Sequence, residues 1–111
     1  MKTALRFFTI VFAASVLSAC STVKVGRDFD VTLFAARVEQ GVTNQGQVRV
    51  WLGEPNSMGI NMGADGEKLE EWSYYFAFGE MTDMSHARIK LLQVKFDKQG
   101  KVRSYNWSNS R

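Results

Sequence analysis

The chain contains few of the residues that build covalent cross-links, metal sites or catalytic centres. Its 111 residues include one Cys, one His and one Pro. A single Cys excludes a disulfide within the chain, and one Cys with one His falls short of the four ligands of a structural zinc site. The same scarcity removes most nucleophile–base pairs used in hydrolysis, so we expect a protein without enzymatic activity. At this length the chain has room for one small domain.

Long apolar runs are also absent. Residues 7–19 form an uncharged, mainly apolar run of thirteen residues, whereas a membrane-spanning helix needs about 20. Lys2 and Arg6 precede the run, and small residues end it. A basic start, a short apolar stretch and a small-residue end are typical of a secretory signal peptide. We therefore expect residues 1–19 to be a leader and not part of the folded domain.

The run ends in the four residues Leu17-Ser18-Ala19-Cys20. This ending resembles the lipobox of bacterial lipoproteins, and the resemblance implies cleavage between Ala19 and Cys20 and attachment of lipid to Cys20. In that family an Asp after the Cys favours retention in the inner membrane, so Ser21 implies an outer-membrane protein that faces the periplasm. No cofactor besides this covalent lipid is expected. The competing interpretation is an ordinary cleaved leader that leaves Cys20 as a free thiol.

Part of the positive charge lies in this leader. The whole sequence has 14 Lys and Arg residues against 11 Asp and Glu residues, a net charge of +3. Removal of residues 1–19 takes away Lys2 and Arg6, which leaves twelve bases against the same 11 acids. The remaining bases are scattered and form no basic run. The sequence therefore gives no indication of a nucleic-acid partner.

Two short amphipathic helices are expected early in the domain. The first begins at a cap on Asp30 and ends at Gly41, because apolar residues recur between them at helical spacing. Thr43 is expected to cap the second helix, and Gly53 ends it. Since about two residues join the helices, they form a helical hairpin.

Three antiparallel strands are expected in the rest of the chain, because apolar and polar residues alternate there with a period of two. The expected strands are residues 71–78, 89–96 and 101–107. Residues 56–68 and 79–86 are expected to be loops, and residues 97–100 a tight turn. This order predicts an α+β domain of two layers, ααβββ, in which a short helical hairpin packs on a three-stranded antiparallel sheet. The domain is placed at residues 29–111, after a lipidated tether of residues 20–28.

Five short motifs follow one another along this domain. They are Gly41-Val42-Thr43, Val48, Leu52-Gly53-Glu54-Pro55, Trp72-Ser73-Tyr74 and Val94-Lys95-Phe96. Their order and spacing resemble the BamE-like family of outer-membrane lipoproteins, also called SmpA/OmlA. The resemblance implies the same ααβββ fold and a scaffold that binds other envelope proteins, including the complex that inserts outer-membrane β-barrels. The longer loop before Trp72 departs from the assembly factor of that family and leaves the partner open.

A candidate partner-binding surface follows from the expected final hairpin. If Phe96 lies opposite Val102, and Val94 opposite Ser104, four large side chains share the sheet face away from the helices. These are Tyr75, Leu91, Tyr105 and Trp107. Exposed Tyr and Trp residues are common anchors of protein interfaces. The competing interpretation is that the tail or a long loop covers them, or that the register is one residue off.

A second candidate site uses sulfur ligands in the two expected loops. Its residues are Met58, Met62, Met81, Met84 and His86. Thioethers and imidazole suit Cu(I), so a small-ligand or copper-binding lipoprotein is the alternative function. The spacing is irregular, however, and Met is also a flexible filler at protein surfaces. We therefore expect a protein-binding or scaffold role in outer-membrane assembly or envelope integrity, with no metal site.

Overall fold

The computed structural model describes residues 22–110. The expected leader, its cleavage point between Ala19 and Cys20, and the lipid site on Cys20 lie outside the described residues. The described elements are β1 (Thr22–Gly26), α2 (Val31–Arg37), α3 (Gln45–Leu52), β2 (Ser57–Met62), β3 (Lys68–Glu80), β4 (Asp83–Phe96) and β5 (Val102–Ser110).

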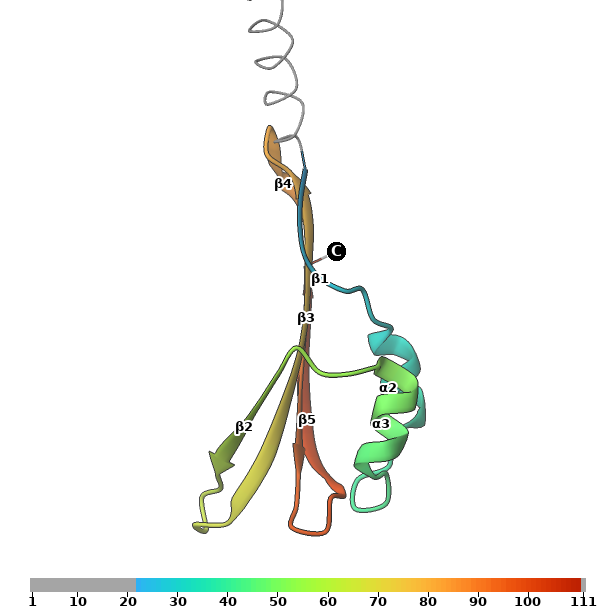
Figure 1. The fold of residues 1–111 in the computed structure, drawn as a ribbon, viewed down its shortest axis with the longest axis vertical. Coiled ribbons are helices and arrows are strands. Elements are labelled where there is room, and N and C mark those ends of the chain that lie inside the picture. Colours follow the sequence, from blue (N-terminus) through green and yellow to red (C-terminus); the bar gives the residue numbers. More distant parts are fainter. Residues whose placement is uncertain (1–21, 111) are drawn as a thin grey trace, which may run out of the picture.

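The elements form two layers, with both helices on one face of an antiparallel sheet (Figure 1). The expected mixture of two helices and an antiparallel sheet is confirmed. The sheet differs in size, because it has five strands where three were expected. Its path runs β1-β3-β4-β5, and β2 also pairs with β3.

Strand β3 organises this sheet. One edge pairs with β4 along most of its length. The other edge pairs with β2 from Lys68 to Ser73 and with β1 from Phe76 to Glu80. Asn56 fills the interval between these partners, because its side chain accepts a hydrogen bond from the backbone N–H of Tyr75 at 2.9 Å. The edge is thereby paired by two strands that are far apart in the sequence.

Local sequence sets the helix ends. Asp30 caps α2 as expected, with its side chain accepting a hydrogen bond from the Leu33 N–H at 2.9 Å. The expected cap of α3 was wrong by one residue, because Asn44 and Gln47 form a reciprocal capping box. Thr43 instead accepts a hydrogen bond from the backbone N–H of Glu39 at 2.8 Å and so closes the loop between the helices.

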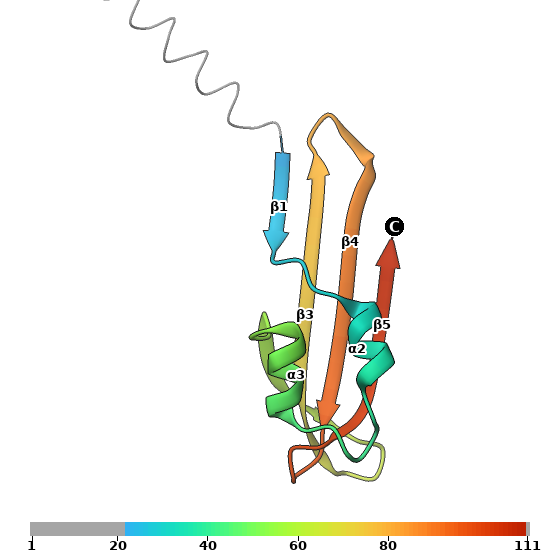
Figure 2. The same ribbon diagram turned by 90° about the vertical axis from the view of Figure 1, so that its right-hand side faces the viewer.

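The helices bury only one half of the sheet. They lie over the end away from the turn between β3 and β4, so the other half of the long hairpin projects beyond them (Figure 2). The core beneath them consists of Phe29, Val31, Phe34, Val48, Leu52, Trp72, Tyr74, Phe76, Leu92, Val94, Phe96 and Val102. Trp72 and Phe96 pack with their ring centroids 4.7 Å apart. Neither helix in the described part has the length and apolar composition needed to cross a membrane.

Three segments expected to lack strands are strands in the structure. Thr22–Gly26, within the expected tether, forms β1, and Ser57–Met62, within an expected loop, forms β2. The polar segment 79–86 continues β3 and β4 up to a turn at Met81 and Thr82. Hairpin hydrogen bonds join backbone groups and need no apolar side chains, so polar composition did not stop the strands.

Gly26 gives a test of the close contact between β1 and β3. Its φ is +75°, and a Cβ there would overlap the carbonyl oxygen of Tyr75. Gly41 has a similar φ of +78° but faces open space. Gly41→Ala should lower the free energy of unfolding by about 1 kcal/mol from backbone strain alone. Gly26→Ala should cost at least about 1 kcal/mol more, measured by urea denaturation. Equal losses would contradict the contact.

Candidate binding surfaces

The expected aromatic patch is divided between the two faces of the sheet. Phe96 pairs with Val102 as expected, but the register then shifts, so Val94 pairs with Tyr105 and Leu92 with Trp107. The expected pairing of Val94 with Ser104 was wrong, because a bulge in β5 adds one residue. Directly paired residues share a face, and a one-residue shift moves a side chain to the opposite face. Tyr105 and Trp107 therefore lie on the face that bears the helices.

Tyr105 has a packing role on that face. Its ring meets Phe34 of α2 edge-on, with centroids 5.1 Å apart. Such perpendicular aromatic pairs are a favoured geometry. Trp107 lies one row further on, beside the buried Leu92, and is 52% exposed. The two residues expected to bind a partner together with Tyr75 and Leu91 are thus separated from them by the thickness of the sheet.

Tyr75 and Leu91 do lie together. They are paired neighbours of β3 and β4 on the face opposite the helices, here called the open face. The next row contains Val25, Ala77 and Ile89. We call these five residues the open-face patch. Tyr75, Leu91, Val25 and Ile89 are exposed, which indicates a continuous apolar surface without a cover among the described residues.

The positions directly next to the open-face patch carry no charge, and Glu71 lies one row beyond them, where it accepts a hydrogen bond from Gln93 at 3.3 Å. On the open face the neighbouring positions of the four strands are Val23, Ser73, Gly79, Ala87, Gln93, Asn106, Ser108 and Ser110. The β5 members are hydroxyl or amide residues, so the apolar centre is bordered by a polar margin on that side. Val25, Ala77 and Ile89 were not named from the sequence. The alternation Tyr75-x-Ala77 and Ile89-x-Leu91 is the sequence signal that could have identified Ala77 and Ile89.

The candidate sulfur ligands are not brought together. Met58 and Met62 lie on β2, opposite Trp72 and Lys68 of β3. Met81, Met84 and His86 lie at the other end of β3, beyond Glu80. Eight residues of strand separate Trp72 from Glu80, which is about 26 Å. Within residues 22–110, no three His, Cys, Asp or Glu side chains gather as a metal site requires.

A cluster of three polar side chains orders the start of β4. Asp83 accepts a hydrogen bond from the Ser85 hydroxyl and lies 2.7 Å from Nδ1 of His86. These contacts, with Ser85 foremost, lower the pKa of Asp83 below its usual value. Ser85 and Asp83 both contact the same ring nitrogen of His86. A hydrolytic triad instead uses the two nitrogens separately, so this cluster is a local structural feature.

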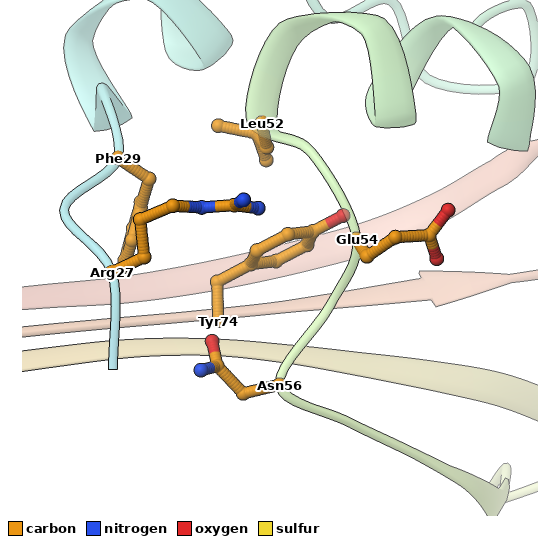
Figure 3. A pocket seen from close by; sticks show the side chains of 6 residues that line it. All are labelled: Arg27, Phe29, Leu52, Glu54, Asn56 and Tyr74. Carbon is orange, nitrogen blue, oxygen red and sulfur yellow. The ribbon is translucent and has the colours of Figure 1, made fainter. Parts of the chain in front are cut away.

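A small pocket lies where the chain from β1 passes the end of α3 (Figure 3). Its residues are Arg27, Phe29, Leu52, Glu54, Asn56 and Tyr74. The Tyr74 hydroxyl donates to the carbonyl of Gly53 at 2.8 Å, and Glu54 pairs with Arg49 at 3.2 Å. The Arg27 guanidinium extends toward α3, whose carboxyl end attracts cations. The polar groups of Tyr74, Glu54 and Asn56 form internal contacts, so the pocket is a junction between layers.

No protein-family model, curated protein or solved structure matches this chain.

The buried Tyr74 hydroxyl predicts a loss of stability at alkaline pH. Burial, followed by the nearby Glu54 carboxylate, raises the pKa of Tyr74 from 10.0 to about 12. The fold therefore favours the neutral phenol, and this contribution is complete below pH 10 and lost as the pH rises through 12. The linked loss reaches about 2 kcal/mol by pH 12.

Urea denaturation of the parent chain and Tyr74→Phe across pH 8 to 12 measures this effect. Tyr74→Phe should be about 1 kcal/mol less stable at pH 8, because the Gly53 carbonyl loses its donor. Its stability should then fall less steeply above pH 10 than that of the parent chain. Tyr75→Phe, at an exposed neighbour, should behave as the parent chain does. A parallel decline for Tyr74→Phe would show that another group is responsible.

Proposed function

We propose that this chain is a lipid-anchored protein of the bacterial outer membrane that binds another envelope protein through the open-face patch. The observation that carries the binding role is the open face itself. It presents Tyr75, Leu91 and Ile89 in adjacent rows with no charged residue among their open-face neighbours on the paired strands. The anchoring role rests on the lipobox that ends at Cys20.

A protein partner suits the composition of this surface. Protein interfaces combine an apolar, charge-poor centre with a polar margin, and Tyr is a frequent anchor. The open face has these parts, with the open-face patch at its centre and the hydroxyl and amide groups of β5 at one margin. The half-exposed ring of Tyr75 offers a large contact area with few rotatable bonds.

The BamE-like resemblance supports a scaffold role. Three of its motif residues have structural tasks here: Gly53 ends α3, Trp72 lies in the core and Tyr74 joins β3 to α3. The part of the fold that corresponds to the family pattern is α2, α3, β3, β4 and β5. We therefore propose membership of that family, with the barrel-assembly complex as the first partner to test.

Loss of the anchor tests the membrane half of the proposal. Cys20→Ser removes the sulfur that would carry lipid, and several acyl chains give firm membrane binding where one gives marginal binding. After fractionation of cells that express the full chain, the parent protein should sediment with outer membranes and Cys20→Ser should not. Mass spectrometry should find acyl groups on Cys20 only in the parent. An unacylated parent with a free thiol would refute the anchor.

Site-specific photo-crosslinking tests the binding half. A photoreactive residue at position 89 of the full chain should capture a discrete partner in intact envelopes, because Ile89 is exposed in the centre of the open face. Position 50 is the matched control, since Val50 is an exposed apolar residue of α3 that lies on another surface. Mass spectrometry of the adduct identifies the partner.

A second variant separates specific capture from chance encounters. Leu91→Asp places a charge next to position 89 and should lower the yield of the adduct about tenfold, since an unpaired buried charge opposes association. Circular dichroism checks that the fold survives. A barrel-assembly subunit in the adduct would support the narrower proposal. Equal yields from positions 50 and 89, or no effect of Leu91→Asp, would contradict binding at the open face.

A further inference from the structure

The register of β1 fixes where a lipid on Cys20 would attach. Thr22 pairs with Glu80, the last residue of β3 before the turn to β4. Cys20 is two residues before Thr22 in the sequence. Two residues span at most about 7 Å, even when fully extended. An anchor on Cys20 is therefore held close to the turn between β3 and β4, which we call the hairpin tip (residues 80–84).

The hairpin tip carries an exposed apolar side chain at its extremity. Met81 lies in the turn and is 59% exposed, whereas Met84, which is 54% exposed, follows Asp83 and has its sulfur beside Gly79. A solvent-exposed two-residue hairpin turn is usually built from Gly, Asn or Asp. Flexible thioether side chains adapt to irregular apolar surroundings, such as the upper acyl region of a bilayer.

Next to the hairpin tip, three adjacent strands place a cationic residue on each side of an aromatic residue. Phe78 pairs with Lys24 on one side and with Arg88 on the other, so all three project from the helix-bearing face. Phe78 is 42% exposed, and neither cation forms an ion pair within residues 22–110. Two residues of strand place this row about 7 Å from Glu80. Apolar groups in front of cations match the order of acyl chains and phosphates in a lipid surface.

We infer that the hairpin tip docks on the lipid surface that holds the anchor, with β3 standing across the headgroup layer. Met81 reaches the boundary of the acyl chains, while Lys24 and Arg88 meet lipid phosphates. Glu80 and Asp83 limit the depth to the headgroups, because ionised carboxylates do not enter hydrocarbon. This inference rests on the proposed lipid anchor.

This orientation also places the two ends of the sheet. The twelve steps of β3 from Glu80 to Lys68 span about 40 Å, so the turn between β2 and β3 lies far from the membrane. The open-face patch belongs to the half nearer the hairpin tip. A partner that reaches it is expected to be membrane-bound itself, or to lie against the membrane.

Depth-dependent quenching tests the docking with the full, acylated chain. Because Cys20 carries lipid in the proposal, a cysteine introduced elsewhere is the one free thiol and accepts a fluorophore that reports on polarity. Met81→Cys places the label at the hairpin tip. Met62→Cys is the matched control, because Met62 is also 59% exposed but lies at the other end of the sheet, opposite Lys68. Vesicles contain phosphatidylethanolamine, phosphatidylglycerol and a nitroxide-headgroup lipid.

The label at position 81 should lose about half or more of its emission, as expected for a group 5–10 Å into the headgroup boundary, and should shift to the blue. The label at position 62 should remain unquenched. Flotation of the same samples reports anchoring separately. Chains that fail to float would refute the anchor and the docking with it. Floating chains with equal quenching at the two positions, or none at position 81, would overturn the docking and leave the anchor standing.

Discussion

The structure depends on the pairing of one long strand on both of its edges. The thirteen residues of β3 hold β4 along one edge and share the other between β1 and β2. The face of β3 toward the helices supplies Trp72 and Tyr74, and Tyr74 hydrogen-bonds to the end of α3. Trp72 and Tyr74 therefore take part both in the pairing of the sheet and in the packing of the helices on it. A change in β3 register would move this aromatic face to the wrong side and disconnect both layers.

The unequal lengths of helices and strands explain why the sheet has a covered and an uncovered half. Helices α2 and α3 have seven and eight residues and are about 10–12 Å long, whereas β3 extends about 40 Å. Two such helices shield only one half of their face. Beyond them the helix-bearing face carries Lys24, Lys90 and Arg88 among its aromatics, while the paired rows of the open face in this half, Tyr75–Leu91 and Val25–Ala77–Ile89, carry no charged residue. The two faces of the uncovered half thus differ in chemistry.

Much of the covered half was predictable from the sequence, because its signals are local. Asp30 marks the start of α2 through its side-chain hydrogen bond, Gly53 marks the end of α3 through its positive φ, and the aromatic alternation of β3 follows from burial on one face. Strands β1 and β2 were missed although Val23-x-Val25 and Met58-x-Ile60-x-Met62 alternate. Two or three alternating residues are a weak strand signal, and the glycines nearby indicated a loop instead. Their pairing depends on a strand distant in sequence, which no local pattern specifies.

The faces of Tyr105 and Trp107 were mispredicted for a similar reason. A hairpin turn sets the first pair, Phe96 with Val102, but one extra residue after it reverses the face of everything that follows. Packing decides this choice: the shifted register brings Tyr105 against Phe34 and closes the border of the core. The bulge therefore removes two aromatic side chains from the open face and leaves Tyr75 as its aromatic residue among the paired strands. Because the core lies in the other half, the exposed side chains of the uncovered half add little to the packing that holds the fold.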